Sequence, residues 1–231
     1  MRRAILAAAL ALFAGAAVSA CGSTTSTTTV TVTVPVTFTA SIPAPATTVP
    51  EPASSTYPGP DVVPVEVGPF LAPATTTALG RRVNGIQCDY LRQLAYRTYA
   101  HLQVYVNGQP RAIPGGVGMV DAYPGRTGYG PIFTAGACYY WLHTRAADGV
   151  IQVESPTART FTLGDFFAIW NQALSRTRVA SASGPVSVLI NGHPYHGNPA
   201  AIPLREHEQI QLAVGSPVPG FQPIDWTGTP F

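Results

Sequence analysis

The chain contains no lysine, and only 10% of its 231 residues carry a charged side chain. Its thirteen basic residues are therefore all arginine, and eleven acidic residues oppose them. Loss of Arg2 and Arg3 with an N-terminal signal would leave eleven arginines against eleven acids. A near-neutral protein without a basic face lacks the electrostatic means of holding nucleic acid, so we expect no nucleic acid partner.

The motifs that commonly mark enzyme sites are also missing. The sequence has no G-x-S-x-G nucleophile elbow, no S-x-x-K, no H-E-x-x-H zinc motif, no P-loop and no dinucleotide-binding glycine pattern. Its glycine run Gly115–Gly118 follows Pro114 in a predicted turn and does not join a strand to a helix. We therefore predict that the protein is not an enzyme.

The apolar run that follows the first two arginines, Ala4–Val18, has fifteen residues, which is too short to cross a membrane. Residues 1–20 are typical of a secretory signal peptide. The run ends in Val18-Ser19-Ala20-Cys21, which resembles a bacterial lipobox, where the cysteine is acylated and becomes the new N-terminus. We expect a lipid on Cys21 to hold the protein at the extracytoplasmic face of the cell membrane. The alternative is a plain secretory signal followed by an incidental cysteine.

Cysteine is scarce, with three residues in the whole chain. Once Cys21 is acylated, only Cys88 and Cys138 remain, and outside the cytoplasm such a pair is most often oxidised. We therefore predict a disulfide between them. A redox or metal-binding pair is the alternative, but neither residue belongs to a C-x-x-C motif.

Residues 22–79 contain no basic residue and consist mainly of Thr, Ser, Val, Pro and Ala. Such a composition buries too little apolar surface to fold, so residues 21–80 are predicted to hold the lipidated cysteine and a disordered Thr/Pro-rich linker. Within it, Thr29–Val36 alternates Thr and Val, which leaves a strand as the alternative there. We expect a globular domain over residues 81–216 and a Pro/Gly-rich C-terminal tail, residues 217–231, docked on it.

The domain alternates strand patterns with turn signals and has one clear helix pattern, which predicts an α+β fold of mainly antiparallel strands. Thr162 and Asp165 form a capping-box pattern at the start of a helix expected over Leu163–Leu174. Hairpin turns are expected at Asn107-Gly108, Asp148-Gly149 and Asn191-Gly192. The predicted strands cover residues 94–106, 109–113, 117–120, 139–143, 150–154, 186–190, 193–196 and 209–214, with a helical turn at 88–95 and a loop at 121–136.

Three stretches are similar to the pattern of one protein family: Tyr99–Gly108, Leu142–Pro156 and Phe161–Phe167. They resemble the sequences H-x-H-L-x-V-x-V-N-G, L-H-T-H-D-x-x-G-V-I-H-V-E-S-P and F-T-L-G-x-F-F of uncharacterised secreted or lipid-anchored bacterial proteins, common in actinobacteria. The histidine-rich strands of that family imply a metal site. This chain keeps two of the histidines, His101 and His143, and has Tyr99, Arg145 and Gln152 where the family has histidine.

These departures leave two hypotheses. The first needs no cofactor: a non-catalytic domain that binds a cell-wall component or an envelope protein through an exposed aromatic face. The alternative is a metal-binding lipoprotein that holds copper or zinc with His101, His143 and Glu154, although the fixed cation of Arg145 opposes a metal there. The residues predicted for the ligand surface are Tyr99, His101, Tyr105, Tyr140, His143, Arg145 and Glu154.

Overall fold

The structure of the protein is a computed structural model that describes residues 58–231. The predicted signal peptide, Cys21 and the first part of the predicted linker, up to residue 57, lie outside the described residues, as does Thr29–Val36. Within the part of the chain that the structure describes, no helix is long and apolar enough to cross a membrane.

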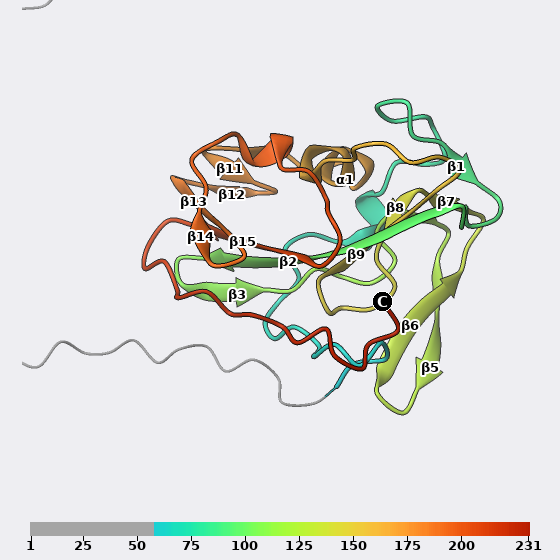
Figure 1. The fold of residues 1–231 in the computed structure, drawn as a ribbon, viewed down its shortest axis with the longest axis horizontal. Coiled ribbons are helices and arrows are strands. Elements are labelled where there is room, and N and C mark those ends of the chain that lie inside the picture. The colour runs from blue at the N-terminus through green and yellow to red at the C-terminus, as the bar shows by residue number, and fades with distance from the viewer. Residues whose placement is uncertain (1–57) are drawn as a thin grey trace, which may run out of the picture. The chain divides into compact units, whose positions relative to one another are not determined.

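One seven-stranded sheet forms the centre of the domain (Figure 1). Its strands pair antiparallel, except that β2 and β15 run parallel. With one α-helix among the described residues, this arrangement confirms the predicted α+β fold. Across the sheet the strands are β14 (His193–Pro194), β13 (Val186–Ile190), β15 (Glu208–Val214), β2 (Tyr96–Val106), β9 (Val150–Ser155) and β8 (Leu142–His143), and β3 (Gln109–Arg111) also pairs with β2.

Strand β2 has eleven residues, and most of its length is buried. Ala100, Leu102 and Val104 are fully buried and belong to the main apolar core, because alternate residues of a pleated strand point to the same side. The hairpin predicted at Asn107-Gly108 is confirmed: both residues have positive φ, 51° and 75°, and the chain returns as β3.

The other two predicted hairpins are also present in the sheet. Asn191 and Gly192 have φ of 50° and 81° and connect β13 to β14. Strands β8 and β9 pair antiparallel on either side of a turn that includes Gly149, whose φ is 74°. The Asp-Gly signal therefore located a true reversal of the chain, although the connection is longer than a two-residue turn.

Three smaller groups of strands lie outside the central sheet. They are β1 (Cys88–Asp89) with β7 (Cys138–Tyr140) and β4 (Met119–Val120); β10 (Leu174–Ser175) with β11 (Arg178–Val179) and β12 (Ala182–Ser183); and β5 (Tyr123–Thr127) with β6 (Gly130–Ala135).

Two of the predicted elements are wrong. The expected loop at 121–136 contains the β5–β6 hairpin, which the sequence hides because every β5 residue is exposed and no apolar alternation marks the strand. The helical turn expected at 88–95 does not form, since Cys88 and Asp89 pair with β7 as strand β1. Pairing with a distant strand overrides the weak local preference here.

The helix α1 (Leu163–Ile169) begins at the predicted capping box. The Thr162 side chain accepts a hydrogen bond from the Asp165 N–H, and the Asp165 carboxylate accepts one from the Thr162 N–H. The helix is shorter than predicted because Asn171 adopts a left-handed conformation, with φ of 57°, which ends the helix. Two short 3-10 helices, η1 (Ala74–Thr76) and η2 (Pro199–Ala201), complete the helical elements of the described residues.

The predicted boundary between linker and domain at residue 81 is wrong, because residues 58–80, here called the N-terminal arm, pack on the domain. Val63 is fully buried and Leu71 belongs to the apolar core. The arm is also tied by backbone hydrogen bonds from Glu66 N–H to Ala147 O (2.8 Å) and from Leu71 N–H to Ala112 O (2.9 Å). The Thr/Pro-rich composition conceals these few anchoring side chains.

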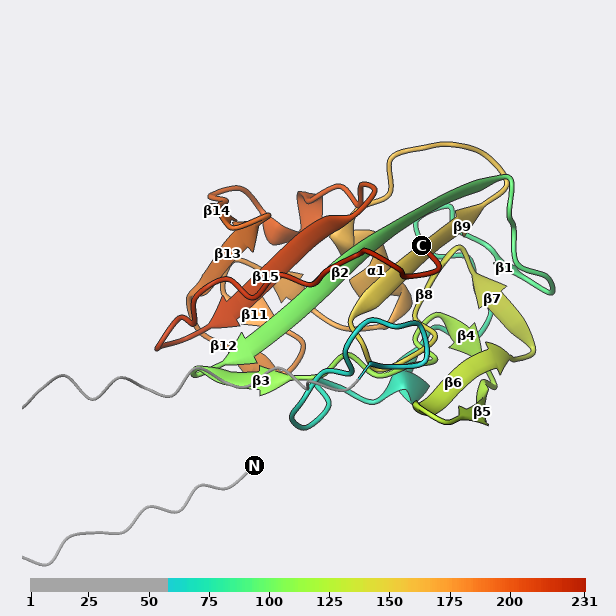
Figure 2. The ribbon, with the colours of Figure 1, turned by 60° about the horizontal axis from the view of Figure 1, so that its bottom comes forward.

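Residues 217–231, here called the C-terminal strap, dock without a helix or strand, as the tail was expected to do. Two glutamines of β15 hold the strap backbone: Gln209 exchanges two hydrogen bonds with Ile224 (2.8 and 3.0 Å), and Gln211 accepts one from the Gln222 N–H (3.1 Å). Phe231 packs against Tyr99 of β2 with its ring tilted by 34°, and the ring centroids are 4.7 Å apart. The strap therefore crosses β15 and β2 toward β9, where the chain ends (Figure 2).

Cys88 and Cys138 form the predicted disulfide, with their Cα atoms 5.4 Å apart. The bond joins β1 to β7, which already pair as neighbouring strands. It closes a loop with a sequence separation of 50, and the chain-entropy model assigns such a loop a stabilisation of about 4 kcal/mol.

Replacing both cysteines with serine tests this contribution. The variant C88S/C138S is expected to lose about 4 kcal/mol of unfolding free energy, because the unfolded chain regains the conformations that the closed loop excludes. Denaturant unfolding followed by circular dichroism measures the loss. Equal midpoints for the variant and the oxidised protein would contradict it.

Candidate functional site

The register of β2, β9 and β8 brings most of the predicted site residues to one face of the sheet. Tyr99 on β2 and His143 on β8 both lie opposite Gln152 of β9, on its two sides. Directly opposed residues project from the same face, as do residues two apart on one strand. This face therefore carries Tyr99, His101, Tyr105, His143 and Glu154.

The prediction that this face is exposed is wrong. His101, His143 and Glu154 are only 3%, 1% and 3% exposed, and Tyr105 is 1% exposed. The N-terminal arm and the C-terminal strap, whose packing the strand pattern does not reveal, cover the part of the face that β2 contributes. The remaining predicted residues are also covered: Tyr140 is fully buried with its hydroxyl donating to Arg81 O, while Tyr99 and Arg145 are partly buried.

The covered face holds a group of polar side chains, here called the polar cluster, that come from β2, β8, β9, the β8–β9 turn and the N-terminal arm. Several of them have buried polar atoms with no hydrogen-bond partner among the described residues. Buried polar atoms are normally hydrogen-bonded, and leaving one unpaired costs about 1–3 kcal/mol, so a concentration of them indicates a functional site. The cluster consists of Asp61, Glu66, His101, Gln103, His143, Arg145, Asp148, Gln152 and Glu154.

His143 and Glu154 form a close pair within the cluster. The Nδ1 of His143 lies 3.1 Å from Tyr140 O; since a carbonyl only accepts, Nδ1 carries the proton and the lone pair is on Nε2. This Nε2 lies 3.6 Å from Glu154 Oε2. Burial lowers the pKa of His143 to about 4, so the ring is neutral at pH 7.

The carboxylate of Glu154 also meets a cation. Arg92 Nε lies 3.4 Å from Glu154 Oε2, and the Arg92 side chain is 37% exposed. Burial raises the pKa of Glu154, while the charge of Arg92 lowers it. Two acceptor atoms, a ring nitrogen and a carboxylate oxygen, thus face one another with a guanidinium at the rim.

Glu66 and His101 meet at Gly149. Glu66 Oε1 and His101 Nε2 each lie 2.8 Å from the point where a Cβ of residue 149 would stand, and φ of Gly149 is 74°. Only glycine leaves both atoms their space and adopts this backbone conformation without strain. Burial raises the pKa of Glu66 well above its usual value and lowers that of His101 to about 4. The two side chains are therefore close together in a dry setting.

Asp148 and Asp61 complete the acidic side of the cluster. Asp148 Oδ1 accepts a hydrogen bond from the Val150 N–H (3.0 Å), which is the turn role expected of it. Burial raises the pKa of Asp148 to about 7. Asp61 Oδ1 lies 3.8 Å from Arg145 Nη1, so Arg145 pairs with the N-terminal arm. Its charge also lowers the pKa of His143, as expected of a cation beside that histidine.

The two histidines of the predicted metal site lie on opposite sides of β9. Their strands are two spacings apart, which places their Cα atoms at least roughly 10 Å from one another. Among residues 58–231, no group of three or more His, Cys, Asp and Glu side chains is arranged to hold a metal ion. The pair that lies in close contact is His143 with Glu154, and a copper or zinc site stays a prediction.

Sequence reasoning missed Asp61, Glu66 and the strap as parts of the site. The two acids lie in a stretch that composition assigned to the linker. Each acid is held in the site by an interaction with a residue that lies far along the chain. One signal was available: valines follow Asp61 and stand on both sides of Glu66 in Asp61–Val67, an unusual pattern for a solvated tether.

Comparison with protein-family models, with curated proteins and with solved structures found no match to this chain. The resemblance noted in its sequence therefore stays a prediction, and the site is interpreted from its own geometry.

The substitution Asp148→Asn tests the electrostatics of the cluster. The carboxyl ionises near pH 3.8 in the unfolded chain but near pH 7 in the folded protein, so the folded protein binds more protons between these values. Stability contributed by Asp148 therefore falls as pH rises from about 4 to about 7 and then levels off. Unfolding free energy of the variant minus that of the wild type should rise over this range, by at most roughly 4 kcal/mol.

Chemical denaturation at pH 4, 5.5, 7 and 8.5 measures this difference. The matched control is Asp121→Asn, because Asp121 is exposed. The control should show no comparable trend with pH. A flat difference for Asp148→Asn across the same range would contradict the argument.

Proposed function

We propose that the protein is a lipid-anchored module of the cell envelope that lies outside the cytoplasm and binds its ligand without catalysing a reaction. Two observations support the location: the signal-like start that ends at Cys21, and the bond between Cys88 and Cys138, since disulfides persist in oxidising compartments.

The polar cluster is the observation that carries the binding function. Its unpaired atoms include both acceptors, such as Asp148 Oδ2, and donors, such as Gln152 Nε2, and they are collected on one face of the sheet. If this face only had to stabilise the fold, apolar side chains would serve there equally well. Replacing both partners of a buried polar pair by apolar groups leaves the stability nearly unchanged. The cluster is therefore best explained by a ligand that completes these interactions.

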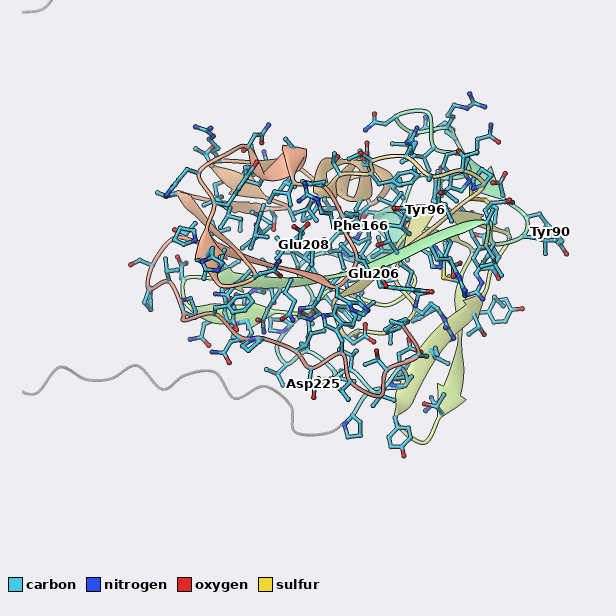
Figure 3. The ribbon with its side chains drawn as sticks, viewed as in Figure 1. Tyr90, Tyr96, Phe166, Glu206, Glu208 and Asp225 are labelled. Atoms are coloured by element: carbon cyan, nitrogen blue, oxygen red, sulfur yellow. A yellow bond between two sulfur atoms is a disulfide. The ribbon has the colours of Figure 1, made fainter. Side chains whose placement is uncertain are left out.

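A cell-wall or envelope protein partner would meet other side chains than those predicted from the sequence. Large exposed aromatic residues of the described chain include Tyr90, which projects from the segment after β1 (Figure 3), Phe70, Tyr123 and Tyr129.

Substitution of Cys21 with serine tests the anchor. The wild-type protein should partition with membranes and its N-terminal peptide should carry the mass of acyl chains on Cys21, because several chains bind a bilayer far more firmly than one. Cys21→Ser should move the protein to the soluble fraction or the medium. Wild-type protein with an unmodified N-terminus, free in the medium, would contradict the anchor.

A second candidate function is metal binding at the pair His143 and Glu154. Two ligand atoms about 2.1 Å from one tetrahedral metal lie roughly 3.4 Å apart, and His143 Nε2 and Glu154 Oε2 are 3.6 Å apart. A metal here would replace the ion pair of Glu154 Oε2 with Arg92 Nε, which lies 3.4 Å away. The neutral ring of His143 has its lone pair on the atom that faces the carboxylate. These residues would supply two of the ligands of copper or zinc.

Titration calorimetry of the full-length mature protein with Zn²⁺ and Cu²⁺ tests this candidate. One ion per chain should bind, and His143→Ala and Glu154→Gln should each weaken binding by at least roughly tenfold. His193→Ala is the matched control, since His193 is exposed at the β13–β14 turn. Absence of stoichiometric uptake, or an equal loss in the control, would rule out a metal at this pair.

A further inference from the structure

An apolar pocket of about 420 Å³ lies between the N-terminal arm and the β5–β6 hairpin, which run beside one another (Figure 1 and Figure 2). The ring of Phe133, one of its lining residues, lies directly on the backbone of Gly115, where a Cβ would be 2.8 Å from Phe133 Cδ2. The Phe133 N–H also donates to Arg145 O at 2.8 Å, so strand β6 is fixed to the domain at this point. Because five prolines line it, it is here called the proline pocket: Pro60, Pro73, Pro114, Pro124 and Pro131.

Two aromatic side chains of the proline pocket are largely in solvent. Phe70 of the arm is 58% exposed, and Tyr129, at the turn of the β5–β6 hairpin, is 61% exposed. Tyr129 has the one side-chain hydroxyl among the described residues that line the pocket, and none of these residues is charged. A patch of this kind marks contact with a protein or a membrane. A pocket that selects one small molecule would in addition place several polar groups around it.

The charges of the arm and the hairpin suit an anionic surface. The two acidic residues of the arm turn inward: Asp61 is buried, and Glu66 accepts a hydrogen bond from the Ile113 N–H at 2.6 Å. The hairpin, residues 123–135, has a single charged residue, Arg126, which is exposed. Exposed aromatic rings beside an arginine are typical of membrane surfaces, where the rings lie among the headgroups and the cation meets anionic lipid.

The chain that leads from the predicted anchor enters the domain at the edge of this patch. Residues 22–57 join Cys21 to Pro58, which is the first residue that the structure describes. Pro60, two residues further on, lines the proline pocket. A lipid on Cys21 would therefore tether the domain beside the patch. Such a tether raises the effective concentration of lipid at the patch.

We propose that Phe70, Tyr129 and the proline pocket that they line form a membrane-facing surface, which rests in the interfacial layer of an anionic bilayer. The two rings enter the headgroup region, with the hydroxyl of Tyr129 toward water and Arg126 at the lipid phosphates. Burial of two rings gives weak, reversible binding, which the tether makes effective by keeping the domain near the membrane. This inference rests on the anchor proposed above and uses residues outside the polar cluster.

Vesicle binding by the chain without its lipid tests this surface. The mature chain with Cys21→Ser should sediment with vesicles of equal parts phosphatidylcholine and phosphatidylglycerol, because the surface does not need the acyl chains. Phe70→Ser combined with Tyr129→Ser should lower the partition coefficient at least roughly tenfold, since two rings lose their burial in lipid. Tyr90→Ser is the matched control and should bind unchanged, because Tyr90 is 79% exposed but does not line the pocket.

A fluorescent variant reports the contact without removing it. Tyr129→Trp should add emission, relative to the parent chain, that shifts to the blue on vesicles and is quenched by brominated lipid. Tyr90→Trp should show neither change. No sedimentation with vesicles, an equal loss of binding in Tyr90→Ser, or no added quenching in Tyr129→Trp would each overturn the proposal. So would a dimer that Phe70→Ser and Tyr129→Ser abolish, in a chain that does not bind vesicles, because a second copy would then cover the patch.

The anchor and the surface can fail separately. If wild-type Cys21 is acylated but the Cys21→Ser chain does not bind vesicles, the membrane-facing surface is refuted and the anchor stands. If Cys21 carries no lipid and the Cys21→Ser chain still binds through Phe70 and Tyr129, the anchor is refuted and the surface is supported.

Discussion

The burial of both faces of β2 is the constraint on which the rest of the structure depends. One face contributes Ala100, Leu102 and Val104 to the apolar core, and the other holds His101 and Tyr105 under segments without regular structure. A strand covered on both sides needs partners on both edges, which the parallel neighbour β15 and the antiparallel neighbour β9 supply. The apolar core stabilises the fold. That stabilisation offsets the free-energy cost of burying polar side chains on the opposite face.

Burial also sets the charge of that polar face. Desolvation raises the pKa of the carboxyls of Glu66 and Asp148 and lowers the pKa of His101 and His143, so it disfavours the charged form of each. Nearby arginines make only smaller contributions to the pKa shifts of Asp148 and His143. The same dryness that makes these groups costly makes their interaction with a fitting ligand strong, because little water competes for it.

The two covering segments are held in different ways, which bears on access to the cluster. The N-terminal arm is tied by backbone hydrogen bonds and by buried side chains such as Val63 and Leu71. The strap is held by the side-chain amides of Gln209 and Gln211, and by ring stacking such as that of Trp226 on His207, whose centroids are 4.6 Å apart. Side-chain clamps of this kind lock fewer backbone groups than strand pairing does, so the strap is the easier cover to displace.

Local pattern in the sequence determined the elements whose cause is local. The capping box at Thr162, the Asn-Gly turns and the alternation of β2 could each be identified within a few residues, and the cysteine count predicted the disulfide. Tertiary structure alone decided which face of β2 is covered, that Asp61 and Glu66 belong to the domain, and that His143 meets Glu154 rather than His101. Those outcomes depend on contacts between residues far apart in the chain. Composition and periodicity indicate which secondary structure a residue prefers, but they do not identify the distant residue that it contacts.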